Sequence, residues 1–228
     1  MRTRLGIDLG ELPDEPEALY ESAQIAWIAC GGHAGDAETM RSAVARCRKH
    51  GVLVGAHPSY PDRAGFGRTA TAMAPDALRE TARAQCAALR AIAGEVIACK
   101  PHGALYHAAA RDPEVARALV GGVAEALGPV PIVGPPGGAC AAIAPAYWTE
   151  GFADRGYRGD ALVPRGEPGA LLGVEAAIAQ AKALAGRFDV LCVHGDSPDA
   201  VAIAREVRRV LREEAPLPRR GRGWPKAG

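Results

Sequence analysis

The sequence predicts an α/β fold in which seven short parallel strands alternate with helices and curl into a barrel. Seven runs rich in Val, Ile, Leu and Ala recur along the 228 residues, and most are separated by segments with helix start and stop signals. No linker of distinct composition and no internal repeat divides the chain. Strands that alternate with helices pair in parallel through right-handed crossovers. An open, doubly wound sheet is the alternative architecture.

Apolar runs and capping residues locate the elements. The strands are expected at residues 5–8, 25–29, 52–56, 96–100, 132–134, 147–152 and 190–194. Asp36 is a suitable N-cap for a helix that continues to His50 and ends at Gly51. Asp112 and Ser197 are similar caps, and each is followed by proline, which is favoured at the first helical position.

The longest predicted helix begins at Pro75 and ends near Gly94. Spacings of three and four residues place one apolar stripe on its core-facing side, made of Leu78, Ala82, Cys86 and Leu89. At the end of the chain, residues 216–228 hold three prolines, three glycines and four basic residues without apolar periodicity. This composition predicts a disordered tail after a single domain at residues 1–215.

Composition favours a soluble protein that acts on a small molecule. The 27 Lys and Arg exceed the 26 Asp and Glu by one, and no basic stripe interleaved with aromatics indicates nucleic-acid binding. No run of apolar residues is long enough to cross a bilayer, and the N-terminal stretch is too short for a signal peptide. The six scattered cysteines form no CxxC pair and are expected to be buried thiols. We therefore expect a cytoplasmic protein without nucleic-acid or membrane partners.

Four short strings each contain a histidine framed by glycine or proline. They are ACGGHAGD (29–36), VGAHPSYPD (54–62), CKPHGALY (99–106) and LCVHGD (191–196). Three of them follow a predicted strand directly, which places His57, His102 and His194 at carboxyl ends of strands. Parallel α/β folds build their active sites at these ends.

Other ionisable residues follow the predicted strands in the same way. The full set is Asp8, His33, Asp36, His57, Asp62, Lys100, His102, Asp154, Arg155, His194 and Asp196. Burying an unpaired charge is costly, so packing alone does not explain such consistent placement. The pattern predicts one active site at the mouth of the barrel.

Two chemistries suit these residues. The histidines and carboxylates could transfer protons as general acids and bases. Alternatively, Asp8, His33 and His57 could hold a divalent metal ion that activates water. Spacing does not decide between them, since no HxxxH or HExxH motif is present. Lys100, Arg68 and Arg155 are candidates for holding a carboxylate or a phosphoryl oxygen. Neither a GxxxxGK[ST] loop nor a GxGxxG motif is present.

Taken in order, several strings resemble the LamB/YcsF family. They are IACGGHAGD, HGVLVGAHPSYPDRAGFGR, KPHGALYH, FADRGY with LVPRGEPGA, and CVHGDSPDAV, and the match extends from residue 5 to about residue 211. The resemblance implies a seven-stranded, TIM-barrel-like fold of the glycoside hydrolase and deacetylase type. It also implies a part in the ring opening of 5-oxo-L-proline to L-glutamate, with ATP as co-substrate and with two further subunits, B and C.

The resemblance assigns tasks to the predicted site residues. Those expected to be catalytic are Asp8, His57, Lys100, His102, His194 and Asp196. Those expected to bind substrate are Glu11, His33, Asp36, Asp62, Arg68, Asp154 and Arg155. A divalent metal stays an open alternative, with Asp8, His33 and His57 as its candidate ligands.

Three positions depart from the family's usual pattern. Arg4 and Gly6 stand where an acidic residue and an asparagine are usual, and Trp27 replaces another asparagine. Alternate residues of a strand share a face, so these changes would alter a polar cluster inside the barrel. Two further hypotheses therefore stand beside the first. The chain could be a stand-alone, metal-dependent amide hydrolase or deacetylase, or an impaired paralogue that binds a small acid or partner subunits.

Overall fold

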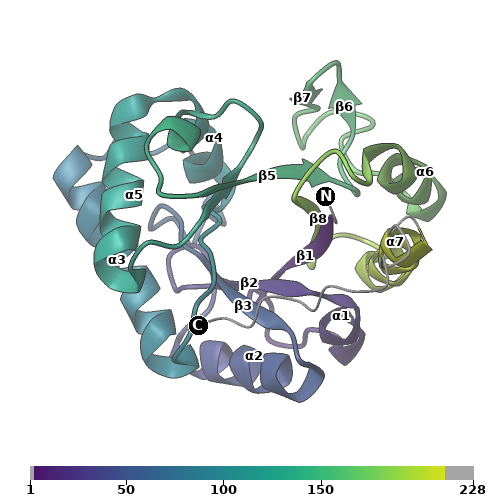
Figure 1. Ribbon diagram of the computed structural model, residues 1–228, viewed down its shortest axis with the longest axis horizontal. Coiled ribbons are helices and arrows are strands. Elements are labelled where there is room, and N and C mark those ends of the chain that lie inside the picture. The colour runs from purple at the N-terminus through teal and green to yellow at the C-terminus, as the bar shows by residue number, and fades with distance from the viewer. Residues whose placement is uncertain (1–2, 214–228) are drawn as a thin grey trace, which may run out of the picture.

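The computed structural model describes residues 3–213 and places a curled parallel sheet inside a ring of helices (Figure 1). The sheet has six strands in the order β3-β2-β1-β8-β5-β4. They are β1 (Arg4–Leu9), β2 (Ile25–Ala29), β3 (Leu53–His57), β4 (Ile132–Gly134), β5 (Tyr147–Phe152) and β8 (Val190–His194). Every paired neighbour is parallel. The predicted α/β class with parallel strands is confirmed.

One of the seven predicted strands, at residues 96–100, is not a strand in the structure. Within it, Cys99 forms single parallel bridges with Ala56 of β3 and Ile132 of β4. Lys100 N donates a hydrogen bond to Ala56 O at 2.9 Å, and Val133 N donates to Cys99 O at 2.8 Å. The segment forms only one bridge to each neighbour, so the count of seven strands is not confirmed. The segment nevertheless lies between the two edge strands and fixes Lys100 there.

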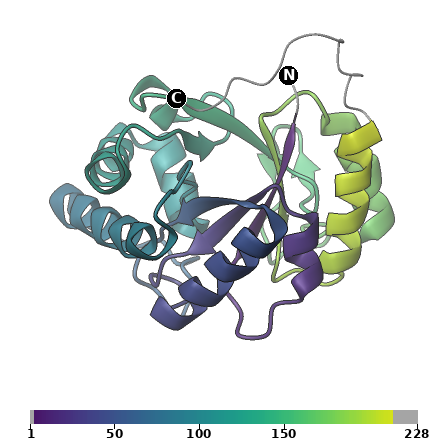
Figure 2. The same ribbon diagram turned by 60° about the horizontal axis from the view of Figure 1, so that its bottom comes forward.

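Helices cover the outer face of the sheet, as Figures 1 and 2 show from two directions. They are α1 (Glu17–Ser22), α2 (Ala37–His50), α3 (Pro75–Ala93), α4 (Gly103–Arg111), α5 (Pro113–Leu127), α6 (Val174–Leu184) and α7 (Ala200–Glu213). A 3₁₀ turn, η1 (Ala139–Ala142), and a small antiparallel hairpin of β6 (Tyr157–Arg158) and β7 (Ala161–Leu162) complete the fold. Among residues 3–213, no helix is long and apolar enough to cross a membrane.

Most of the predicted helix ends are confirmed. Asp36 caps α2 by accepting hydrogen bonds from two backbone N–H groups, and Gly51 ends the helix in the left-handed conformation. Asp112 caps α5, and the stripe predicted for α3 comprises the four residues of that helix that are buried. The cap predicted at Ser197 is wrong, because α7 begins three residues later. The Ser197 hydroxyl instead donates to Asp154, 3.0 Å away. The predicted tail at 216–228 lies outside the described residues.

Successive side chains of β1 point alternately toward the hydrophobic core under the helices and toward the barrel interior. Leu5, Ile7 and Leu9 belong to the large core cluster shared with the helices. The alternate residues, Gly6 and Asp8, face the other side of the strand. The residues there form a second, smaller apolar cluster at the base of the interior, made of Ile25, Trp27, Ala98, Val133 and Val190.

Trp27 fills part of the barrel interior between Gly6 of β1 and Gly55 of β3. Its indole is fully buried and lies between the backbones of Gly6 and Gly55. A Cβ atom at Gly6 would meet Trp27 Nε1 at 2.4 Å, and one at Gly55 would meet the six-membered ring at 2.3 Å. Two of the departures from the family pattern, Gly6 and Trp27, are therefore sterically complementary.

This complementarity predicts a coupled effect on stability. Gly6→Ala should lower the free energy of unfolding by about 1–3 kcal/mol, because the added methyl overpacks a rigid ring. The same substitution should cost much less in a Trp27→Val background, where the space is empty. Urea denaturation of the four proteins measures the coupling. Gly166→Ala is the matched control, since a Cβ there meets nothing within 4 Å. Equal costs for Gly6→Ala in both backgrounds would contradict the prediction.

Candidate active site

The polar residues at the strand ends meet in one place. They lie at the wall of a cavity of about 1140 Å³. The predicted residues that line it are Asp8, His57, Arg68, Lys100, His102, Arg155 and His194. Asp8, His57 and His194 come from the ends of β1, β3 and β8, while Lys100 and His102 follow the bridged segment at Cys99. The structure thus brings these seven predicted residues together at one cavity.

Lys100 and Asp8 form a buried ion pair at the centre of the site. Lys100 Nζ is 2.6 Å from Asp8 Oδ1, 2.9 Å from Cys192 Sγ and 3.2 Å from Glu150 Oε1. Burial alone would raise the pKa of Asp8, but the Lys100 ammonium and His57 hold it well below its usual range. Burial would likewise lower the pKa of Lys100, but Asp8 and its other partners hold it above. Both groups are therefore charged at neutral pH.

Sequence reasoning missed Glu150 and Cys192, which surround this pair. Both are interior residues of strands, β5 and β8, whereas the prediction considered the residues after the strands. The Cys192 thiol accepts from Lys100 and donates to Asp8 Oδ1, 3.6 Å away. A charged residue inside an otherwise apolar strand was the available signal for Glu150, because a buried carboxylate needs a partner.

Glu150 has an unusual environment for a carboxylate. It is 2% exposed, and neither of its oxygens has a hydrogen-bond partner among the described residues. Burial raises the pKa of Glu150 to about 7, although the nearby Lys100 acts to lower it. The hydroxyl of Tyr106, another cavity residue, is also buried without a hydrogen-bond partner in the described part of the chain. A group that titrates near neutral pH is suited to proton transfer.

Asp154 orients His194 toward Asp8. The Asp154 carboxylate is 3.0 Å from His194 Nδ1, and it also accepts from the His194 backbone N–H at 2.9 Å. Burial would raise the pKa of Asp154, but His194 keeps it below its ordinary value. With Nδ1 held in this way, Nε2 points toward Asp8 Oδ2, 3.9 Å away. The arrangement fixes both the ring and its tautomer.

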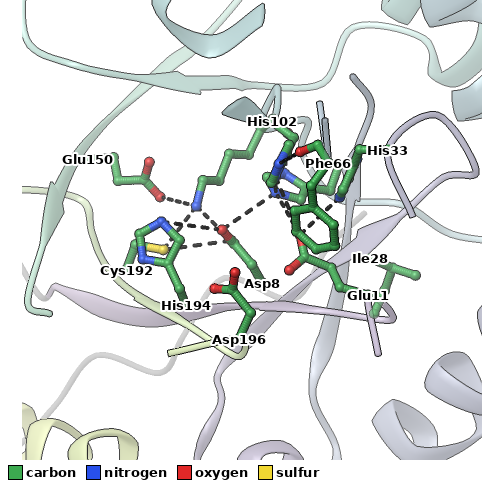
Figure 3. Close-up of polar contacts among 12 residues, drawn as sticks. Asp8, Glu11, Ile28, His33, Phe66, His102, Glu150, Cys192, His194 and Asp196 are labelled. Carbon is green, nitrogen blue, oxygen red and sulfur yellow. Dashed lines mark hydrogen bonds and ion pairs between the residues drawn. The ribbon is translucent and has the colours of Figure 1, made fainter. Parts of the chain in front are cut away.

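A second polar cluster lies beside the ion pair and contains three histidines and Glu11 (Figure 3). Glu11 Oε1 is 2.9 Å from His33 Nε2, 3.3 Å from His102 Nδ1 and 3.8 Å from His57 Nε2. The rings of His33 and His102 are stacked, with centroids 3.7 Å apart. Burial raises the pKa of Glu11 well above its usual value, and burial lowers the pKa of His33 to about 2.

Two groups of residues have ligand atoms close enough to hold a metal ion. One is Glu11, His33, His57 and His102, and the other is Asp8, Cys192 and His194. The predicted ligand set is divided between them, since Asp8 falls in one group and His33 and His57 in the other. Glu11, His102 and Cys192 were not among the predicted metal ligands.

Two of the predicted substrate-binding residues do not join these clusters. Asp36 caps α2, and Asp62 accepts hydrogen bonds from the backbone N–H groups of Gly65 and Thr69. Both carboxylates therefore hold loop backbone in place.

The remaining three predicted residues lie at the cavity wall or rim. Arg155 is buried and donates to the carbonyl oxygens of Ala170 and Val163. Arg68 and Asp196 form an ion pair with each other.

Comparison with known proteins identifies the family. The family model for LamB/YcsF matches residues 5–217. The chain belongs to the LamB/YcsF family. A curated relative from Methylococcus capsulatus, named as the A subunit of 5-oxoprolinase, is 42% identical over 238 aligned positions that cover 91% of each chain.

Two solved structures are similar to this chain in fold. A lactam utilization protein from Thermus thermophilus is 33% identical, with a TM-score of 0.84 over 93% of this chain and 97% of that one. A family 4 carbohydrate esterase from Streptomyces lividans has a TM-score of 0.52 at 10% identity, over 92% of this chain and 88% of the other. The second likeness concerns the fold alone.

The pKa of Glu150 predicts a pH-dependent stability. A carboxyl whose folded pKa is raised from 4.5 to about 7 makes the native state lose stability as pH rises through this window. Glu150→Gln removes that loss. The free energy of unfolding of the variant relative to the parent should therefore increase between pH 4.5 and pH 8, by up to about 3 kcal/mol.

Urea denaturation at the two pH values measures this difference. Glu175→Gln, at an exposed position of α6, serves as the matched control and should show no such change. A constant difference between Glu150→Gln and the parent at both pH values would contradict the expectation.

Proposed function

We propose that this chain is the A subunit of a 5-oxoprolinase, which opens the lactam of 5-oxo-L-proline to give L-glutamate. The observation that carries the proposal is the 42% identity, over 91% of both chains, to a protein named as the A subunit of this enzyme. The similarity of the fold to a lactam utilization protein supports the same class of substrate. The buried acid, base and ammonium groups at the cavity supply chemistry that suits hydrolysis of a cyclic amide.

ATP provides the driving force in this proposal. The amide carbonyl of a five-membered lactam is stabilised by resonance, so water attacks it slowly. Transfer of the terminal phosphoryl group of ATP to the carbonyl oxygen releases ADP and makes the ring carbon electrophilic. Water then adds to this carbon, the C–N bond breaks, and the nitrogen takes up a proton. A second water releases phosphate and leaves the carboxylate of glutamate.

The charged groups of the site divide into two kinds of task. Asp8 is held ionised beside Lys100, so its free oxygen is suited to orient the attacking water and to take its proton as the bond to carbon forms, when that water has become strongly acidic. Lys100 supplies positive charge close to the reacting carbonyl. Positive side chains on the cavity wall are suited to the substrate carboxylate and to phosphates, and they are Arg68, Arg111, Arg155, Arg165 and Arg187.

Partner subunits complete the proposed enzyme. The relative's name describes one subunit of an enzyme, which supports assembly with B and C subunits that share the work of ATP binding and ring opening. The site of this activity would be the cytoplasm, where ATP is available. We also propose that residues 96–100 act as a seventh, short barrel strand, which the bridges of Cys99 to both neighbouring edges support.

Reconstitution tests the function. The chain, mixed with its cognate B and C subunits, should release glutamate and phosphate from 5-oxoproline and ATP in equal amounts. Asp8→Asn should lower the rate of glutamate release by about 100-fold or more, the range expected for loss of a proton-transfer group. Size-exclusion chromatography verifies that the variant still folds and assembles.

Asp76→Asn is the matched control, because Asp76 is exposed in the first turn of α3, away from the cavity. Its glutamate release should equal that of the parent. No glutamate from the complete mixture would refute the proposal. Turnover by the chain without ATP or partners would instead favour a stand-alone amide hydrolase.

A further inference from the structure

The tautomers of two neighbouring histidines are fixed by backbone carbonyls. His57 Nδ1 is 2.7 Å from Lys100 O, and His102 Nε2 is 2.9 Å from Phe66 O. A carbonyl oxygen only accepts hydrogen bonds, so both of these ring nitrogens carry a hydrogen. The other nitrogen of each neutral ring, Nε2 of His57 and Nδ1 of His102, then presents a lone pair.

These two lone pairs and a carboxylate oxygen converge on one point. His57 Nε2 is 2.9 Å from His102 Nδ1, and Glu11 Oε1 is 3.3 Å from His102 Nδ1 and 3.8 Å from His57 Nε2. With both rings neutral, neither nitrogen can donate to the other, so the 2.9 Å contact between them needs a proton or a cation. A single proton would satisfy one of the three contacts, whereas a divalent cation satisfies all of them at once.

We propose that Glu11, His57 and His102 bind a divalent first-row transition metal ion of the zinc class. Zinc sites with bonds of ~2.0–2.1 Å and tetrahedral angles place neighbouring ligand atoms about 3.3 Å apart. The three distances between Glu11, His57 and His102, from 2.9 to 3.8 Å, bracket this spacing. Three protein ligands leave a fourth position open, and His57 and His102 both line the cavity. The ion would therefore be reached from the cavity.

The surroundings of the three ligands resemble those of known metal sites. Ligand histidines usually donate their second N–H to a backbone carbonyl or a carboxylate, and ligand carboxylates are themselves hydrogen-bonded. His57 and His102 both donate to carbonyls here, and His33 Nε2 is 2.9 Å from Glu11 Oε1. Phe66, whose carbonyl accepts from His102, has a φ of 53°, a strained value for a residue with a side chain. Because His33 Nε2 contacts the oxygen of Glu11, we assign His33 the role of orienting this ligand.

The neighbouring cluster of Asp8, Cys192 and His194 does not compete for the ion. The Lys100 ammonium already contacts Asp8 Oδ1 at 2.6 Å and Cys192 Sγ at 2.9 Å. A divalent cation there would be repelled by this charge and would have to displace it. By contrast, the ion pairs of Glu11 among the described residues are those with the three histidines.

Cobalt binding to the full chain tests the site without reference to catalysis. After treatment with a chelator and dialysis, the chain should bind one equivalent of Co²⁺ with the visible absorption of a four-coordinate ion, and Zn²⁺ should displace it. Elemental analysis should give one Zn²⁺ per chain, and Zn²⁺ should raise the melting temperature. These readouts hold whichever substrate the protein acts on, so their failure is distinct from failure of the 5-oxoprolinase assay.

Variants assign the ligands. His102→Gln and Glu11→Gln should each lose stoichiometric binding and the rise in melting temperature, while circular dichroism reports whether each still folds. His33→Gln should keep one equivalent with about 10–100-fold weaker affinity, as expected for a residue that orients a ligand. His107→Gln is the matched control, because His107 lines the same cavity but belongs to neither cluster.

Two outcomes would overturn the proposal. The first is an absence of stoichiometric Co²⁺ or Zn²⁺ binding by the parent chain, with ¹⁵N NMR showing His57 as a cationic ring that donates to His102. The second is binding that survives His102→Gln and Glu11→Gln but is lost in Cys192→Ser. A thiolate-to-cobalt charge-transfer band in the parent would support this second outcome, because it would place the ion beside Cys192 in the neighbouring cluster.

Discussion

The buried pair of Lys100 and Asp8 is the interaction on which the rest of the site depends. Removing two charges from water costs several kcal/mol per ion, and the cost is recovered only when the remaining donors and acceptors also find partners. Cys192 and Glu150 provide such contacts to Lys100, and His57 lies 3.5 Å from the second oxygen of Asp8. The pair thereby links residues from β1, β3, β5 and β8 to the bridged segment that carries Lys100.

His57 joins the ion pair to the histidine cluster. Its Nδ1 donates a hydrogen bond to the backbone carbonyl of Lys100, while its Nε2 faces both Asp8 and His102. The Lys100–Asp8 pair therefore lies on one side of the site, and the three proposed metal ligands gather on the other. The proposed lactam chemistry and the proposed metal ion use different residues, with His57 at the boundary between them.

The departures from the family pattern have a physical explanation in packing. Trp27 occupies part of the barrel interior, and Gly6 and Gly55 leave the space for its indole. Arg4, at the third changed position, lies over the ring of Trp148, 5.0 Å from its centroid. Gly6 and Trp27 form an apolar layer where the family resemblance implies polar groups, while Asp8 keeps its buried partners. The changes therefore alter the base of the site and leave its two polar clusters in place.

The sequence by itself determined the parallel α/β class, both ends of α2 and α3, the start of α5, and the gathering of several strand-end residues at one cavity. Apolar periodicity, caps and glycine are local signals, and the strand-end rule depends only on topology. Tertiary structure decided which residues share a cluster. It separated Asp8 from His33, brought Glu150 and Cys192 to Lys100, and turned the Ser197 hydroxyl to Asp154. These contacts join residues 40 or more positions apart, and their geometry depends on strand register and interior packing, which no local pattern encodes.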